Sequence, residues 1–178
     1  PDSHMITWLS FSNTSFIIYG FYILSMTTYT DAGVDIDAQD KAISKIKKYV
    51  KNTRTKGVIA DVGNFGGLFK PELSDYENPV LVSSSDGVGT KVKLATFTQT
   101  FHTVGQDLVN HCVNDILVQG AVPLFFNDYI ASSKLDPNQV SEVIRGLTVA
   151  CKENKMALLG GEMAEMPGVY NDSHFDLA

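Results

Sequence analysis

The sequence is poor in cysteine and in basic residues. Its two cysteines, Cys112 and Cys151, lie inside apolar helical patterns and show neither CxxC nor paired Cys/His spacing. We therefore expect reduced core thiols, and neither a disulfide framework nor a zinc site. Only 14 Lys and Arg stand against 20 Asp and Glu, for a net charge of -6. Such a chain offers no basic surface to a phosphate backbone, so we expect no nucleic-acid partner.

The remaining composition is that of an ordinary globular protein. The 178 residues are 44% apolar, 10% aromatic and 19% charged. This length and this apolar content suffice to bury one core, and they exclude a disordered, collagen-like or coiled-coil chain. Together with reduced thiols, they favour a cytoplasmic protein.

The first 25 residues differ in character from the rest. Residues 1–5 have the sequence of a cloning-tag remnant. Residues 6–25 carry no charge and are almost long enough to span a membrane, but polar residues dilute them and no basic segment precedes them. We expect residues 1–25 to be an extension outside the fold, with the protein proper starting at Met26 and making no membrane contact. A membrane anchor is the alternative.

Helical and strand periodicity alternate after Met26. Asp37 can cap a helix that runs to about Lys51, a second helix covers about 104–119, and a third begins at the cap-and-proline pair Asp136-Pro137. Strands are predicted at 80–85, 124–131 and 156–159. The order strand, helix, strand, helix, strand after Lys51 indicates a layered α/β domain with helices against a sheet.

The second helix carries an unusual polar flank. Asp107, His111 and Asp115 are spaced four residues apart, and Asn110 and Asn114 form a parallel row. Asn and Asp are poor residues for a helix interior because their side chains compete for backbone hydrogen bonds. These polar side chains therefore either have a functional role or form an ordinary solvent-exposed helix face, and the spacing is compatible with both interpretations.

Three acidic residues are candidates for a metal site. Asp86 and Glu162 follow predicted strands beside glycines, and Asp115 lies on the polar flank. Carboxylates gathered where glycines admit a ligand can hold Mg²⁺ against phosphate oxygens. The sequence therefore predicts a metal-bridged phosphate site, with ordinary acidic turns as the alternative.

Two glycine-rich runs, 63–67 and 87–91, are neither the dinucleotide-binding motif nor a P-loop. The first is not GxGxxG, and the second is too short for a Walker loop. Both could still contact phosphate through backbone amides. No serine sits in a nucleophile elbow, and the four histidines form no metal-ligand pattern, so His111 is interpreted as a helix-flank residue.

Four segments, in order along the chain, resemble the phosphoribosylformylglycinamidine cyclo-ligase family, also called aminoimidazole ribonucleotide synthetases. They are DAGVDID at 31–37, SDGVGTK at 85–91, CVND at 112–115 with QGAVPLFF at 119–126, and GGEMAEMPG at 160–168. The resemblance extends from Met26 to Ala178. It implies ATP-dependent closure of formylglycinamidine ribonucleotide to aminoimidazole ribonucleotide in purine biosynthesis.

The resemblance also implies roles for individual residues. Metal ligands would be Asp86, Asp115 and Glu162. The nucleotide would contact Gly63, Gly66, Gly67 and Lys91, and the substrate would lie along Gly87, Val88, Gly89, Thr90 and Asn114. ATP and Mg²⁺ are the implied cofactors. Met163 stands where the family usually has Thr, which puts a hydroxyl contact there in doubt.

The architecture implied by the family is a mixed sheet with helices packed on one face, paired into a barrel in a homodimer. Family members are roughly twice as long, so residues 26–178 correspond to the N-terminal domain. We expect this half alone to dimerise but to turn over poorly or not at all. Alternatives are another enzyme of the same ATP-binding superfamily, such as a thiamine-monophosphate kinase, a noncatalytic dimerisation or nucleotide-binding module, and a membrane-tethered form.

Overall fold

A computed structural model of the chain describes residues 35–60 and 66–178. Within these ranges the chain forms four helices and three strands. In chain order they are α3 (Ile36–Lys51), α4 (Lys91–Thr98), α5 (His102–Leu117), β1 (Phe125–Ser132), α6 (Pro137–Glu153), β2 (Ala157–Glu165) and β3 (Phe175–Leu177). The predictions for residues 1–25 and for Gly63 lie outside the described residues.

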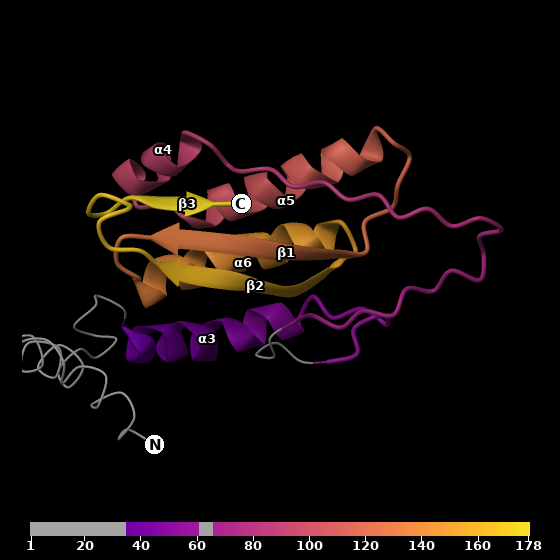
Figure 1. The fold of residues 1–178 in the computed structure, drawn as a ribbon, viewed down its shortest axis with the longest axis horizontal. Coiled ribbons are helices and arrows are strands. Elements are labelled where there is room, and N and C mark those ends of the chain that lie inside the picture. Colours follow the sequence, from indigo (N-terminus) through magenta and orange to yellow (C-terminus); the bar gives the residue numbers. More distant parts are fainter. Residues whose placement is uncertain (1–34, 61–65) are drawn as a thin grey trace, which may run out of the picture.

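The three strands form one mixed sheet in the order β2-β1-β3 (Figure 1). The central strand β1 pairs in parallel with β2, to which α6 connects it, and antiparallel with β3. A parallel pair needs such a crossover connection, usually a helix. The predicted α/β class with a mixed sheet is therefore confirmed.

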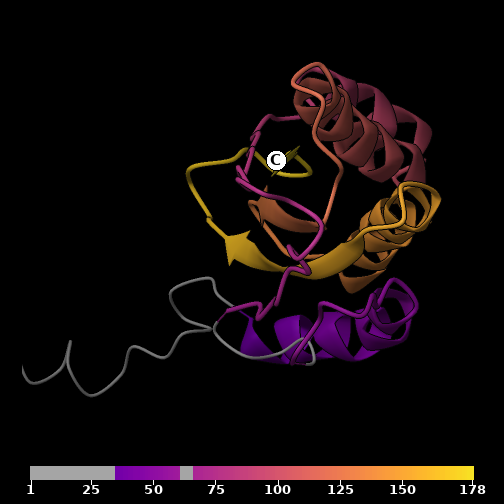
Figure 2. The same ribbon diagram turned by 90° about the vertical axis from the view of Figure 1, so that its right-hand side faces the viewer.

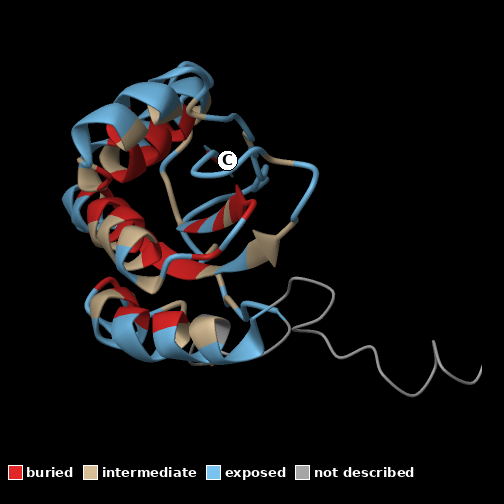
Figure 3. Ribbon diagram, turned by 90° about the vertical axis from the view of Figure 1, so that its left-hand side faces the viewer, coloured by how far each residue is buried: buried red, intermediate tan, exposed pale blue. Residues whose placement is uncertain are grey.

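Helices α5 and α6 pack against each other and cover one face of the sheet, while α3 packs beside α6 and the β2 edge (Figures 1 and 2). Buried residues line the inner sides of these helices and continue onto β1 (Figure 3). The largest fully buried side chains are Leu108, Val109, Val143, Leu147, Cys151 and Leu177. The core is thus the single layer between the helices and the sheet.

Two glycines allow α5 and α6 to approach closely. A β-carbon on Gly105 of α5 would overlap the carbonyl oxygen of Val143, and one on Gly146 of α6 would overlap the carbonyl oxygen of His102. Small residues at a helix crossing let the backbones come together. The relative position of the two helices therefore depends on these residues lacking a side chain.

The first described helix begins two residues earlier than predicted. Its N-cap is Asp35, whose carboxylate accepts a hydrogen bond from the Ala38 N–H at 2.9 Å, so the prediction that Asp37 is the cap is wrong. The backbone N–H of Asp35 also donates to Glu165 at 2.6 Å. This contact with a distant residue helps fix the start of the helix, and local spacing could not reveal it. At α6, by contrast, Asp136 is the N-cap and Pro137 follows it, as predicted.

The strand predictions succeed only in part. The strand at 124–131 is confirmed as β1, but β2 continues well beyond 159, to Glu165, because it pairs with β1 through Gly160 and Gly161. The predicted strand at 80–85 is wrong: that segment has no ladder partner in the described part of the chain, and Val80 is 83% exposed. The short elements α4 and β3 were not predicted. In residues 35–60 and 66–178 no helix combines the length and apolarity needed to cross a membrane.

Candidate functional site

The segment 84–91, which ends at the first residue of α4, runs antiparallel to α5 along its polar flank. Three side-chain contacts join the segment to the helix. They are Ser84 Oγ to Asp115 Oδ2 at 2.9 Å, Asp86 Oδ2 to His111 Nε2 at 2.7 Å, and Lys91 Nζ to Asp107 Oδ2 at 2.7 Å. The row at 107, 111 and 115 is thus a docking face for the segment 84–91, and not merely a solvated surface.

Two of the predicted metal ligands meet here and are joined by a histidine. One ligand atom from each of Asp86, His111 and Asp115 lies within 4.8 Å of the others, and all three residues are exposed. Two carboxylates and an imidazole are a donor set that a divalent cation accepts. The three residues therefore fit a divalent cation.

The carboxylate of Asp86 is held in its ionised form. The backbone N–H of Gly87 donates to its Oδ1 at 2.7 Å, and His111 contacts its Oδ2. These hydrogen bonds, the one from Gly87 first, lower the pKa of Asp86 below its ordinary value. A charged carboxylate is the form that binds a cation.

The model of the family described as AIR synthase related protein, N-terminal domain, matches residues 72–177, which include the whole segment 84–91 and all of α5. The chain belongs to this family.

The AIR synthase domain is also similar to curated phosphoribosylformylglycinamidine cyclo-ligases. The protein of Lawsonia intracellularis is 54% identical over 156 residues, which cover 88% of this chain and 45% of the relative. That of Oleidesulfovibrio alaskensis is 57% identical over 150 residues, covering 84% and 43%, and that of Geotalea uraniireducens is 54% identical over 154 residues, covering 86% and 44%. The resemblance found in the motifs is thereby confirmed. The chain spans less than half the length of these relatives.

The third predicted metal ligand of the AIR synthase domain, Glu162, is not part of the cluster. It lies on β2 opposite Tyr129, and its Oε1 accepts a hydrogen bond from the N–H of Met163 at 2.9 Å. His111, which was interpreted as a plain flank residue, occupies the cluster instead. Its spacing of one helical turn from Asp115 was the signal that could have identified it.

The predicted substrate-binding residues form the loop that enters α4. The N–H of Val88 donates to the carbonyl oxygen of Leu177 in β3 at 2.9 Å, so this amide is already used. Gly89 has a φ of 73°, a left-handed conformation that favours glycine, and Thr90 is the N-cap of α4. Within the described residues neither the N–H of Gly89 nor that of Thr90 donates a hydrogen bond, which leaves both available to an anion. Asn114 is exposed on α5.

The described glycines of the predicted nucleotide segment, Gly66 and Gly67, have different surroundings. A β-carbon on Gly66 would have no neighbouring atom within 4 Å, whereas one on Gly67 would overlap the side chain of Leu159. Gly67 also lines a cavity of about 370 Å³ together with Leu81 and Phe125. Close packing therefore accounts for Gly67, while Gly66 is free to approach a ligand.

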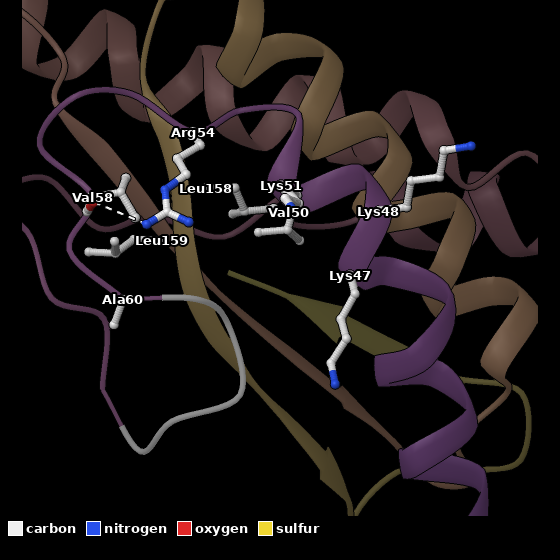
Figure 4. Close-up of a pocket in the computed structure, with 9 residues that line it drawn as sticks. All are labelled: Lys47, Lys48, Val50, Lys51, Arg54, Val58, Ala60, Leu158 and Leu159. Carbon is white, nitrogen blue, oxygen red and sulfur yellow. Dashed lines mark hydrogen bonds between the residues drawn. The ribbon is translucent and has the colours of Figure 1, made fainter.

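A larger cavity of about 430 Å³ lies at the C-terminal end of α3 (Figure 4). Its lining residues are Lys47, Lys48, Val50, Lys51, Arg54, Val58, Ala60, Leu158 and Leu159. The ammonium groups of Lys47 and Lys48 point in different directions, and the Arg54 guanidinium donates to the Val58 carbonyl at 3.5 Å. The basic groups of this cavity do not converge on one point, and it shares no residue with the cluster of Asp86, His111 and Asp115.

The two cysteines are free and buried, as predicted. Burial raises the pKa of the Cys112 thiol and raises that of Cys151 to about 12. A thiol in this state is a poor nucleophile because the thiolate is the reactive form.

Proposed function

We propose that this AIR synthase domain acts in the ATP-dependent closure of formylglycinamidine ribonucleotide to aminoimidazole ribonucleotide, the reaction of phosphoribosylformylglycinamidine cyclo-ligases in purine biosynthesis. Relatives bearing that name are 52–57% identical to the chain. The observation that carries the proposal is the meeting of Asp86 and Asp115 beside the N-terminus of α4.

In this proposal Asp86 and Asp115 hold Mg²⁺, which when bound neutralises the charge of the ATP phosphates. The N–H groups of Gly89 and Thr90 donate to phosphate oxygens at the start of α4, where the helix dipole favours an anion. Asp107 holds the Lys91 ammonium beside this loop at 2.7 Å, where the remaining N–H groups of the ammonium can donate to a phosphate oxygen. Gly66 approaches the nucleotide through its backbone.

The chemistry asked of this chain is positioning and charge neutralisation. Ring closure needs the formamide oxygen activated and the amidine nitrogen held close to the formyl carbon, which orientation can accelerate greatly. Cys112 and Cys151 are buried and belong to the core. Positioning and charge neutralisation are therefore assigned to the carboxylates of Asp86 and Asp115 and to the backbone donors of the segment 84–91.

The proposal extends to assembly and location. We place the working domain at residues 26–178, with residues 1–25 outside it, in a cytoplasmic homodimer. Support for the dimer comes from the exposed apolar segment Val80, Leu81 and Val82, and from the sheet face that α5 and α6 leave uncovered. Exposed apolar surface of this kind is typical of an interface.

Calorimetric titration of the chain with MgATP tests the proposed site. The variants Asp86→Asn and Asp115→Asn should each weaken binding at least tenfold because each loses one charged ligand. Asp172→Asn, which changes an exposed acid away from the cluster, is the matched control and should bind as the unaltered chain does. Equal affinity in all four proteins would refute the assignment. Binding is the readout because the chain spans less than half of its relatives.

A further inference from the structure

We propose that His111 supplies a third, nitrogen ligand to the cation held by Asp86 and Asp115, and that it shifts the preference of the site from Mg²⁺ toward Mn²⁺. This inference rests on the metal site of the proposed function and adds a residue and a selectivity to it.

The position of His111 follows from the helix that carries it. His111 and Asp115 are four residues apart on α5, so their side chains lie on the same face, one turn from each other. Asp86 comes from the loop before α4 and reaches the same face. Two ligands on a rigid helix and one on a loop docked against it form a site that the fold itself assembles.

The distances suit a shared cation after a small adjustment. The Nε2 atom of His111 lies 2.7 Å from Oδ2 of Asp86, and the ligand atoms of all three residues lie within 4.8 Å of one another. A cation with bonds of about 2.1 Å at right angles separates neighbouring ligand atoms by about 3 Å. The pair therefore has to open by only a few tenths of an ångström. The proton between the two atoms leaves to solvent as the cation enters.

The neighbouring contacts orient the two carboxylates of the cluster. The N–H of Gly87 donates a hydrogen bond to Oδ1 of Asp86, and Oδ2 of the same carboxylate faces His111. Ser84 donates to Oδ2 of Asp115. Such outer partners commonly fix the orientation of metal ligands. About half of the His111 side chain is exposed, so the imidazole can turn toward a cation without disturbing the core.

Nitrogen changes which cation is preferred. Mg²⁺ is a hard ion that takes oxygen ligands and keeps several waters. Mn²⁺ also favours oxygen ligands, but as a first-row transition ion it accepts an imidazole nitrogen more readily than Mg²⁺ does. A site of two carboxylates alone should favour Mn²⁺ only slightly. With His111 as a ligand, the ratio of Mn²⁺ to Mg²⁺ affinity should rise about tenfold.

The test is titration of the full chain with MnCl₂ and, separately, with MgCl₂, comparing the unaltered protein with His111→Ala. We expect His111→Ala to lower the Mn²⁺ affinity about tenfold and to change the Mg²⁺ affinity less than threefold. His174→Ala, which removes an exposed histidine from the loop before β3, is the matched control and should change neither. Circular dichroism establishes that each variant is folded.

A spectroscopic signature makes the test independent of affinity. Pulsed electron paramagnetic resonance of bound Mn²⁺ should show a coupled imidazole nitrogen in the unaltered chain and in His174→Ala, and none in His111→Ala. Absence of this coupling with Mn²⁺ bound, or an unchanged Mn²⁺ affinity in His111→Ala, would overturn the inference while leaving the proposed function intact. Failure of the unaltered chain to bind Mn²⁺ would overturn the inference as well. Unchanged MgATP binding in the Asp86 and Asp115 variants would refute the proposed site itself.

Discussion

The hydroxyl of Ser84 donates a hydrogen bond to Oδ2 of Asp115 at 2.9 Å, across 31 residues of sequence. The contact fixes one end of the segment 84–91 on α5, and the Lys91–Asp107 ion pair fixes the other. Asp86 lies between these two contacts and is thereby brought to His111. The candidate site is therefore a product of docking two separate segments.

Removing the Ser84 hydroxyl should loosen Asp115 without removing a ligand. We expect Ser84→Ala to weaken Mn²⁺ binding about tenfold, as the loss of an outer partner commonly does. Calorimetric titration with MnCl₂ measures this. Ser83→Ala, at the adjacent exposed serine, should leave the affinity unchanged, and an equal loss in both variants would show that the hydrogen bond has no specific role.

A side chain at the crossing of α5 and α6 should destabilise the fold. Gly146→Ala places a methyl group against the backbone carbonyl of His102, which cannot turn away as a side chain can. We expect the free energy of unfolding in urea to fall by about 2 kcal/mol or more, despite the higher helix propensity of alanine. Gly66→Ala, where the methyl group meets nothing within 4 Å, is the matched control. Equal stability of the two variants would contradict the close approach.

The buried carboxyl of Asp128 should make stability depend on pH. Asp128 lies on the central strand with only 8% of the residue exposed, and burial raises its pKa to about 7 from an ordinary 3.8. Between these values the folded chain keeps a proton that the unfolded chain has lost. The free energy of unfolding should therefore fall as pH rises from about 4 to about 7, by up to about 1.4 kcal/mol per pH unit from this group.

Asp128→Asn removes that titration. Urea unfolding at several pH values should show a flatter dependence between pH 5 and 7 than in the unaltered protein, whereas the exposed control Asp172→Asn should keep the original slope. The slope, and not the absolute stability, is the readout because a buried amide has its own cost of desolvation. Parallel curves for Asp128→Asn and the unaltered chain would refute the role of this carboxyl.

The start of α3 offers a paired test of helix capping. Asp35→Ala removes the carboxylate that accepts the Ala38 N–H and should cost about 1 kcal/mol of unfolding free energy. Asp37→Ala removes only a negative charge in the first turn. That charge interacts favourably with the helix dipole, but at an exposed position it stabilises the helix less than the N-cap hydrogen bond does. Urea denaturation of both variants measures the difference. A larger loss of unfolding free energy in Asp37→Ala than in Asp35→Ala would indicate that Asp37 is the N-cap, as local spacing predicts.

Residues acting on their immediate neighbours were predictable. The Asp136-Pro137 start of α6 needs only a side chain that reaches two residues along the chain and a ring with a suitable φ. The helix predicted at 104–119 corresponds to α5, shifted by two residues. Asp86 and Asp115 could also be selected as candidate ligands, because carboxylates beside glycines and on a polar helix flank are few in this chain.

Elements that depend on distant partners were not predictable. The run 80–85 has β-branched residues typical of a strand, yet it pairs with no neighbour in the described ranges. The three residues of β3, by contrast, form a strand because they pair with β1. Likewise, Glu162 and Asp86 both stand beside a glycine after a predicted strand, but only Asp86 lies close to His111 and Asp115 of α5.

The sequence by itself determined the family, the α/β class and the helices whose caps and apolar stripes lie within a few residues, because these are set by contacts that local spacing encodes. Only the tertiary structure decided that Asp35 caps α3, that β2 continues to Glu165, and that His111, not Glu162, joins Asp86 and Asp115. Those outcomes depend on which surfaces meet once the chain is packed, and atoms brought together from distant segments leave no periodic mark in the sequence.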